Sequence, residues 1–323
     1  MQGFSLVELM ISLVIGLIIM VATLSAYVSS SGASKISDAQ SRMNEDAQAA
    51  LNLLSQQIRM AGANPVQAGR TASTFPTNPV YIETYVGGSV SVKLAPTTIT
   101  TASSNYAIRG CDGTFGILAT AANIDALTCA GTSTLPDSLA VNYEADRYST
   151  VATSANAPTD CVGQTAPSVT ATYTIGTATT TLNYAVADNR FYIANSSGVT
   201  SLFCKGNGNV TPQPLVENIE DMQLMYGVVS ATNTNTTASI AGYLTADSVV
   251  NDGTLNPALT EPRRWGKVLT VRVCVVVRSE SAVLTDTASG TYVKCDGTTD
   301  SAQTDRRLRR AYSTTVVLRN RRF

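Results

Sequence analysis

The pattern of apolar and polar positions divides the chain into a helical N-terminal part and a longer part typical of β-strands. An apolar run of 24 residues from Phe4 to Tyr27 carries a single charge, on Glu8. As an α-helix this run is about 36 Å long, which is enough to cross the roughly 30 Å hydrocarbon core of a bilayer. A carboxylate in such a helix is costly unless it has a partner, so Glu8 is a candidate functional residue.

The helical pattern continues beyond the apolar run. Apolar or small residues recur at intervals of three, four and seven, as on one face of an α-helix. This face consists of Ile36, Met43, Ala47, Ala50, Leu51, Leu54, Ile58 and Ala61. The opposite, polar face consists of Lys35, Asp38, Arg42, Asn44, Glu45, Gln48, Asn52 and Gln56. The pattern predicts one helix from Phe4 to Ala61, ended by Gly62 and Pro65, with a kink or local melting at residues 29–32.

The remainder of the chain predicts β-structure. Alternating or β-branched segments occur at residues 138–144, 168–175, 181–186, 190–194, 200–205, 268–278, 291–294 and 311–319. Asn195-Ser196-Ser197-Gly198 is a hairpin turn signal, and residues 214–228 predict a short helix that runs into a strand. The fold class is therefore α+β, with a long N-terminal helix packed on a mostly antiparallel β-domain of one or two sheets.

Composition favours an extracellular domain with a nearly neutral surface. Charged residues are 14% of the chain and the net charge is −1, so there is no general attraction to nucleic acid or anionic membranes. The C-terminal segment 306–323 is different, because it holds seven arginines and no acidic residue. This candidate basic contact patch consists of Arg306, Arg307, Arg309, Arg310, Arg319, Arg321 and Arg322. Three interpretations remain open: solvated strand ends that keep a sheet edge from mispairing, contacts with acidic faces of neighbouring subunits, or binding of DNA phosphates.

Six cysteines follow the membrane-length segment, and an even number in that context predicts disulfides formed in an oxidising compartment. Sequential pairing closes the shortest loops and is favoured over free thiols. The predicted bridges are Cys111–Cys129, Cys161–Cys204 and Cys274–Cys295.

The residue types needed for most catalytic and metal sites are missing. The chain has no histidine, no Cys-x-x-Cys pair and no nucleophile elbow, P-loop or dinucleotide fingerprint. Asp296, Asp300 and Asp305 follow Cys295, but they do not match the calcium-binding pattern of an EF-hand. The sequence therefore predicts no enzymatic activity, no cofactor and no metal.

The N-terminal residues Gly3-Phe4-Ser5-Leu6-Val7-Glu8, followed by the long apolar run, resemble the cleavage and methylation motif of type IV prepilins. The resemblance implies that a membrane peptidase cuts after Gly3 and that the new N-terminal Phe4 is methylated. It also implies that Glu8 recruits subunits into a filament by pairing with the amine of a neighbouring chain. Met-Gln-Gly is shorter than the usual leader of such proteins, so the leader is either short or begins upstream. A removed secretory signal ending near Ser34 and a simple membrane anchor are the alternatives.

A second resemblance is to the minor pilins of the PilW family. It is carried by residues 214–228, by Trp265 with the strand 268–273 and Arg278-Ser279, and by residues 312–320; Arg109-Gly110-Cys111-Asp112-Gly113 is also similar. It implies a helix that carries a globular head. The expected divisions are a leader at 1–3, a membrane or filament-core half-helix at 4–28, an amphipathic half-helix at 29–64 and a β-rich domain at 65–323.

The resemblance implies a protein that begins as a single-pass inner-membrane prepilin and is then incorporated near the tip of a surface type IV pilus. Its implied partners are other minor pilins, the major pilin, the prepilin peptidase, the inner-membrane assembly platform and a tip adhesin. Motility, adhesion or DNA uptake would be downstream effects. The alternatives are a pilus-displayed adhesin or DNA-binding module, and a minor pseudopilin of type II secretion.

Overall fold

The computed structural model describes residues 5–65, 84–86, 89–91, 98–99, 106–116, 118, 121–130, 134–175, 178–208, 211–230, 239–301 and 303–320. For residues 84–86, 89–91, 98–99, 170–175 and 178–182 it describes the backbone alone. The expected processing residues Gly3 and Phe4 and the terminal Arg321 and Arg322 lie outside these ranges.

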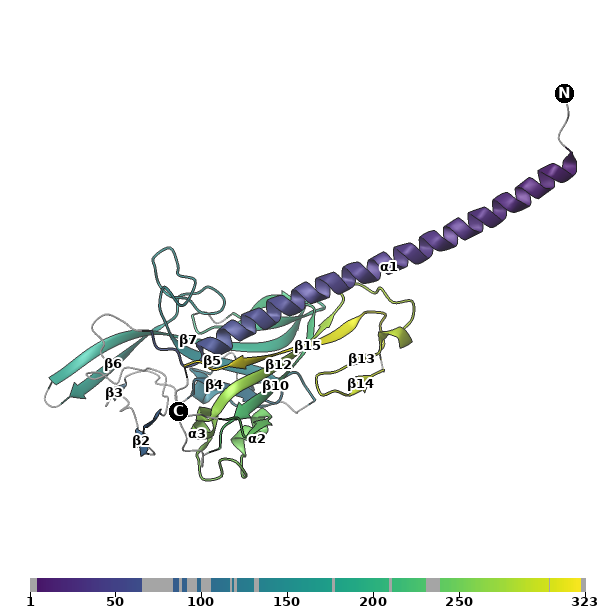
Figure 1. Cartoon of the computed structure of the whole chain (residues 1–323). Helices are drawn as coiled ribbons and strands as arrows, with labels where there is room; N and C mark the ends of the chain where they lie inside the picture. Colours follow the sequence, from purple (N-terminus) through teal and green to yellow (C-terminus); the bar gives the residue numbers. More distant parts are fainter. Residues whose placement is uncertain are drawn as a thin grey trace.

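One helix, α1, runs without interruption from Leu6 to Met60 over 55 residues. Ser5 is its N-cap, and Gly62 follows its C-terminus with a φ of 67°, which a glycine adopts without steric cost. The kink or melting expected at residues 29–32 is wrong, because the helix continues through this segment as one gently curved rod (Figure 1). Ser31 donates its hydroxyl to the carbonyl of Val28, so this polar side chain is satisfied within the helix.

The first sheet has four antiparallel strands in the order β11 (Gly242–Leu244), β10 (Ile219–Val228), β12 (Val268–Arg278) and β15 (Arg309–Val317). The central strand β12 has the bounds that the sequence predicted. Its residues Val271, Val273, Val275 and Val277 are fully buried and alternate along the strand, as expected for a sheet with one face on the core.

The second sheet has seven strands and continues the core on the other side of the domain. Its order is β3 (Thr98–Ile99), β6 (Ser168–Ile175), β7 (Ala178–Ser196), β5 (Ser138–Ala145) and β4 (Ile108–Cys111), with β8 (Val199–Lys205) on β7 and β9 (Gln213–Glu217) on β8. β7 is one strand of 19 residues where the sequence predicted two. Asp188 and Asn189 caused this error, because they lie buried in the strand and are bonded there to Arg190 and Gln57.

Smaller elements connect the sheets. They are the hairpins β1 (Thr84–Val86) with β2 (Ser89–Ser91) and β13 (Tyr292–Val293) with β14 (Thr299–Asp300), the short helices α2 (Ala246–Val250) and α3 (Glu261–Gly266), and the 3-10 turns η1 (Ile124–Ala126) and η2 (Ala288–Gly290).

The hairpin predicted at residues 195–198 is confirmed. It joins β7 to β8, which pair antiparallel up to Ser196 and Val199. Ser197 and Gly198 have φ values of 54° and 88°, as a tight turn between twisted strands requires. The side chain of Asn195 accepts a hydrogen bond from the Gly198 N–H at 3.0 Å, which closes the turn.

The short helix that the sequence predicted after Pro214 is wrong, because this segment forms two strands; the strand predicted at its end is present. β9 ends at Glu217, Asn218 turns the chain with a φ of 62°, and β10 begins at Ile219. The pairing of β10 with β12 shifts register between Ile219 and Asp221. A bulge of this kind inserts one extra residue, so the buried Ile219 and Met222 are three residues apart, the interval that imitates a helix.

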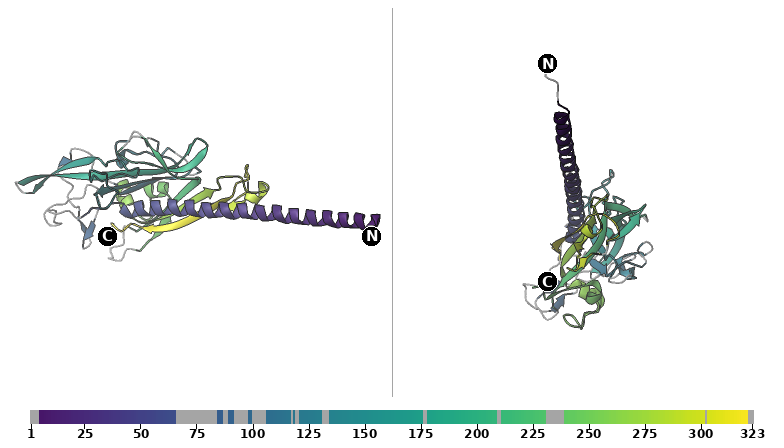
Figure 2. Two further views of the ribbon diagram at one scale, coloured as in Figure 1. Left: turned by 90° about the horizontal axis from the view of Figure 1, so that it is seen from above. Right: turned by 90° about the vertical axis from the view of Figure 1, so that its right-hand side faces the viewer.

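The C-terminal half of α1 packs on the domain through one face and leaves its opposite face exposed. It packs on β12 and β15 of the first sheet and on β5 and β9 of the second (Figures 1 and 2). Its buried stripe consists of Met43, Ala47, Ala50, Leu54, Ser55 and Ile58. The α+β fold class is therefore confirmed, with the strands divided between two main sheets.

The two sheets are also joined directly by Asp137, which precedes β5. Its N–H donates to the carbonyl of Met222, and its carboxylate accepts hydrogen bonds from the N–H groups of Leu224 (2.7 Å) and Gly113 (3.2 Å). Burial raises the pKa of Asp137 to about 7, although these backbone donors act to lower it. The nearby Asp112 and Asp221 raise it further.

The segment from Arg109 to Gly113 is a second point of contact between the sheets. Arg109 forms an ion pair with Glu261 of α3 at 3.0 Å, and Asp112 accepts a hydrogen bond from the N–H of Ala246 in α2 at 2.7 Å. A Cβ atom at Gly110 would overlap the hydroxyl of the buried Tyr226. This close approach explains why a glycine occupies the position.

Three disulfides tie loops to the sheets, and they follow the sequential order favoured by the sequence. They are Cys111–Cys129, Cys161–Cys204 and Cys274–Cys295, with Cα–Cα distances of 5.5, 6.4 and 5.8 Å. These distances lie in the usual range of about 4.4–6.8 Å. In a chain-entropy account each bridge stabilises the domain by about 2–4 kcal/mol.

The buried Asp137 predicts an unusual pH dependence of stability. Because its pKa is raised in the folded state, the wild-type free energy of unfolding should fall as the pH rises from about 4 to about 7, by at most about 1.4 kcal/mol per pH unit. Asp137→Asn should show a clearly smaller slope, whatever its absolute stability; a residual slope comes from Asp46 and Asp221, whose pKa values burial also raises. The measurement is denaturant unfolding of both proteins in detergent solution at several pH values.

Asp286 provides the control for this measurement. It is exposed, and hydrogen bonds from Ser289 lower its pKa, so any contribution it makes has the opposite sign. Asp286→Asn should therefore keep the wild-type loss of stability between pH 4 and 7. Identical pH profiles for wild type and Asp137→Asn would contradict the assignment.

Candidate assembly surface of the N-terminal helix

The N-terminal half of α1 projects from the domain with its apolar side chains uncovered (Figure 1). The exposed apolar residues are Leu6, Val7, Leu9, Met10, Ile11, Leu13, Val14, Ile15, Leu17, Ile18, Ile19, Met20, Val21, Leu24, Tyr27 and Val28. The helix is long and apolar enough to cross a membrane. An apolar surface of this size, covering all sides of a helix, requires lipid or other helices around it.

The serine and threonine hydroxyls between Leu6 and Val28 are satisfied by the helix itself. Ser12, Thr23 and Ser25 each donate to the carbonyl three residues earlier, at 2.9 Å. A hydroxyl bonded in this way adds little cost in hydrocarbon, because it presents no unused donor to the surroundings. Glu8 is therefore the exceptional polar group of the exposed segment.

Glu8 lies in the first turn of α1 and forms a capping box with Ser5. Its Oε2 accepts a hydrogen bond from the Ser5 N–H at 3.0 Å, and the Ser5 hydroxyl accepts one from the Val7 N–H at 3.4 Å. Within the part of the chain that the structure describes, its Oε1 makes no hydrogen bond. The carboxylate is therefore held at the start of the helix with one oxygen available.

The C-terminal half of α1 is fixed to the domain by polar contacts as well as by its apolar stripe. Asn44 Oδ1 accepts a hydrogen bond from the Tyr312 hydroxyl at 2.7 Å. Gln57 Oε1 accepts one from Asn189 Nδ2 at 2.8 Å, and Asn320 donates to the carbonyl of Arg59 at 2.8 Å. Contacts to both sheets and to the C-terminal segment therefore fix the direction in which the free half-helix leaves the domain.

These polar anchors were not apparent in the sequence. The periodicity placed Asn44 on the solvated face, whereas the structure leaves it half-buried against β15. Gln57 and Asn189 lie far apart in the chain and neither belongs to a motif. Only the packing of the helix between the sheets brings each of them to its partner.

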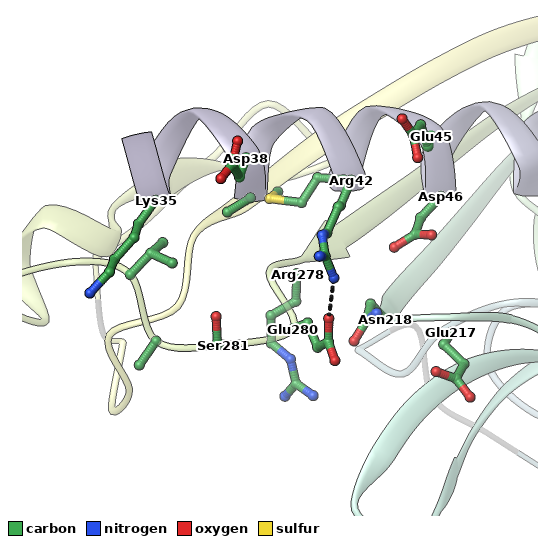
Figure 3. A pocket seen from close by; sticks show the side chains of 14 residues that line it. Lys35, Asp38, Arg42, Glu45, Asp46, Glu217, Asn218, Arg278, Glu280 and Ser281 are labelled. Atoms are coloured by element: carbon green, nitrogen blue, oxygen red, sulfur yellow. Dashed lines mark hydrogen bonds and ion pairs between the residues drawn. The ribbon is translucent and has the colours of Figure 1, made fainter. Parts of the chain in front are cut away.

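A groove of about 730 Å³ lies where α1 enters the domain, between the helix, the turn from β9 to β10 and the loop after β12 (Figure 3). Charged side chains line much of it, among them Lys35, Asp38, Arg42, Asp46, Glu217 and Glu280. Arg42 and Glu280 form an ion pair at 3.0 Å across it (Figure 3). Both side chains are about 70% exposed, so the pair contributes at most about 1 kcal/mol.

The groove does not resemble a catalytic or metal centre. Burial raises the pKa of Asp46, with smaller contributions from Glu45, Glu217 and Glu280, whereas a hydrogen bond from Asn218 lowers it. Throughout the described ranges, no group of three or more His, Cys, Asp or Glu side chains is placed to hold a metal ion. The groove is thus a polar boundary between the free and the packed halves of the helix.

Among the C-terminal arginines that the structure describes, Arg307 and Arg309 have acidic partners. Arg309 is buried between Glu220 and Asp305, with N–O distances of 2.6 and 2.7 Å to these carboxylates. Arg307 also lies beside Asp305, at 4.0 Å. Glu220 comes from β10 and Asp305 directly precedes the arginine segment, and together these two carboxylates neutralise the centre of the predicted patch.

The exposed arginines lie at opposite ends of β15. Arg306 and Arg310 are exposed at its start, and Arg319 is exposed beyond its end. Nine residues of strand separate these ends, a distance of about 30 Å at about 3.3 Å per residue. The arginines are close in sequence, but they lie at opposite ends of an extended strand and are therefore far apart in space.

Comparison with known proteins shows which families this chain resembles. The profile of the type IV pilus-assembly protein W family, PilW, matches residues 190–320, and the prokaryotic N-terminal methylation motif matches residues 1–24. The chain is PilW-like, with a prepilin-type N-terminus. The two resemblances drawn from the sequence are thereby confirmed. The PilW match covers the whole four-stranded sheet, β8, β9 and the end of β7.

Other comparisons add less. No curated relative matches the chain. The type IV-like pilin TTHA1219 from Thermus thermophilus aligns with 58% of this chain and 79% of its own, at 12% identity and a TM-score of 0.25. A similarity this low does not bear on the fold or the function.

The similarity to these two profiles also bears on the class of activity and the location. PilW proteins are structural components of pili, so the expectation that the chain is not an enzyme is confirmed. The methylation motif and the uncovered apolar helix fit a prepilin that is anchored in the membrane and then assembled into a surface pilus. Adhesion and motility remain predictions.

We expect a leucine-to-alanine substitution to have different effects in the two halves of α1. Leu54 is fully buried, so Leu54→Ala should lower the free energy of unfolding of the domain by about 2–5 kcal/mol. Leu24 is 55% exposed, so Leu24→Ala should leave domain unfolding unchanged and weaken retention in membranes instead. Denaturant unfolding in detergent and membrane fractionation measure the two effects. Equal destabilisation by both substitutions would contradict the division of the helix.

Proposed function

We propose that this protein is a minor pilin that primes the assembly of a type IV pilus and remains near its tip. The observation that carries the proposal is the division of α1 into an uncovered apolar half and a half fixed inside a PilW-like domain. A helix of this design can leave the bilayer only if other apolar helices replace the lipid. A filament core made of equivalent helices provides that replacement.

Processing is the first step of the proposed mechanism. Cleavage after Gly3 would make Phe4 the N-terminal residue, one position before Ser5, whose N–H is held by Glu8. Methylation keeps the positive charge of the new amine. The free oxygen of Glu8 is then available to an amine on a neighbouring chain.

Pairing of Glu8 with that amine would guide the insertion of the helix among its neighbours. In hydrocarbon an unpaired carboxylate costs about 2.5–3.5 kcal/mol or more, so a buried position beside a cation is strongly preferred. The apolar residues around Glu8 favour packing without selecting a register. The charge pair fixes the axial position of one helix relative to the next.

The β-domain would decide which subunits become neighbours. Its direction relative to the helix is fixed by the contacts of Asn44, Gln57 and Arg59, so helix register and domain contacts are set together. We therefore propose as partners other minor pilins, the major pilin and a tip adhesin. The prepilin peptidase and the inner-membrane assembly platform would act before incorporation.

Binding of DNA receives less support than assembly. The predicted basic patch is divided between two strand ends, and Arg309 is occupied by Glu220 and Asp305. A pseudopilin of type II secretion would share every feature described here. The test below separates it from a pilus component.

The test is the identity and location of the N-terminal peptide. Filaments sheared from the cell surface should contain this protein, and mass spectrometry should find a methylated Phe4 at its N-terminus. A processed protein confined to membranes would favour the pseudopilin instead. An intact Met1, or a start near Ser34, would contradict the prepilin assignment.

Glu8→Ala should separate processing from assembly. The cleavage site is unchanged, so the variant should be cut and methylated, whereas its content in sheared filaments should fall severalfold because the charge pair is lost. Asp38→Ala is the matched control, since Asp38 is an exposed carboxylate of the same helix outside the apolar run. Quantitative mass spectrometry of filaments measures both variants. Normal incorporation of Glu8→Ala would exclude the pairing.

A further inference from the structure

The four-stranded sheet ends in a long, regular edge strand, β15 (Figure 2). β15 pairs with β12 at nine consecutive positions, from Arg309 opposite Arg278 to Val317 opposite Thr270, without a register shift. The sequence from Ala311 to Val317 contains no charge and no proline. Ser313, Thr315 and Val317 are exposed.

The backbone of β15 has a row of polar groups directed away from the sheet. The Leu318 N–H donates to Leu269 at 2.9 Å and the Leu308 carbonyl accepts from Ser279 at 2.8 Å, so the even-numbered residues between them face β12. After Arg309, the outward residues are therefore Ala311, Ser313, Thr315 and Val317. No backbone hydrogen bond joins their N–H or C=O groups to another residue that the structure describes.

Other edges of the two large sheets are blunted, as stable monomers require. At the opposite border of the same sheet, β11 has three residues. In the seven-stranded sheet, β3 has two residues, β4 has four, and β9 contains Pro214 and pairs with a register shift. β15 is thus the long, regular edge of the first sheet.

We propose that the edge of β15 receives an extended strand from another pilus subunit, which continues the sheet by antiparallel or parallel pairing. The proposal rests on the proposed function, because it names the contact through which the domain selects a neighbour. Main-chain hydrogen bonds to the outward groups of β15 would supply the affinity. The side chains at the two ends would supply the selectivity.

The charges around β15 define the partner strand. Arg306 and Arg310 are exposed at one end and Arg319 at the other, while the residues between are neutral. A complementary strand is uncharged over about five residues and carries Asp or Glu at both ends. A second copy of this chain fits poorly, because either orientation of β15 on β15 brings arginine ends together.

The position of β15 fits a contact between subunits. Tyr312 of β15 is bonded to Asn44 of α1, so the edge runs alongside the helix that enters the filament. A neighbour that packs on the β15 side of the free half of α1 would therefore lie close to this edge. A neighbour whose helix packs on α1 is already held close to β15. Helix packing therefore raises the effective concentration of its strand at this edge.

The first experiment measures hydrogen exchange of the full chain in detergent with a synthetic peptide as the probe. The peptide has a Thr-Val-Thr-Val-Thr centre with two glutamates at each end, and a control peptide has lysines in their place. The glutamate peptide should slow exchange of the amides of Ala311, Ser313, Thr315 and Val317, whereas the lysine peptide should not. Unchanged exchange, equal protection by both peptides, or dimerisation of the chain through β15 would overturn the proposal.

Thr315→Pro removes one outward N–H and leaves the bonds to β12 intact, as a proline on a sheet edge can. It should weaken binding of the glutamate peptide by about tenfold or more, while Thr315→Val, which keeps the N–H, should bind as wild type does. If Thr315→Pro does not fold, the exchange experiment on the wild-type chain alone decides the question.

The same variants test the contact in filaments. Thr315→Pro should be depleted from sheared pili and Thr315→Val should be retained. If Thr315→Pro is incorporated as well as wild type, the edge contact is wrong but the protein is still a pilin. If even the wild-type chain is absent from pili, the proposed function fails instead.

Discussion

The architecture depends on one constraint: a single continuous helix must be stable in two different surroundings. The stripe that contains Leu54 and Ile58 is buried between two sheets, at about 1.5–3 kcal/mol for each large side chain. The preceding residues offer an apolar surface on all sides and depend on lipid or on neighbouring helices. Because α1 has no break at residues 29–32, movement of the free half is transmitted to the domain as a rigid rotation.

The domain is built so that this rotation is well defined. The two sheets contact the helix on different sides and are joined to each other through Asp137 and through the segment from Arg109 to Gly113. Burial of Asp137 is costly in itself, but its two oxygens satisfy backbone N–H groups from both parts of the domain. Disulfides then hold the long loops to the sheets, so that the surfaces offered to neighbours keep a fixed shape.

Much of this could be read from the sequence because local signals and tertiary packing agree. The bounds of β12 and the turn at Asn195–Gly198 were predicted correctly, since the valine alternation and the turn residues depend on near neighbours. The sequence-based predictions were wrong where local signals and tertiary packing disagree. The bulge after Ile219 moved buried residues to helical spacing, and the buried polar residues Asp188 and Asn189 imitated the end of a strand.

The sequence by itself determined the membrane-length helix, its carboxylate at Glu8, the β-rich class of the domain and the similarity to prepilins, because each is written in a continuous run of residues. The tertiary structure decided which polar residues anchor the helix and how the arginines are distributed. Asn44 contacts Tyr312, and Arg309 contacts Glu220, only after elements distant in the chain are placed side by side. The open edge of β15 is likewise a property of strand order, which depends on long-range pairing that no local pattern specifies.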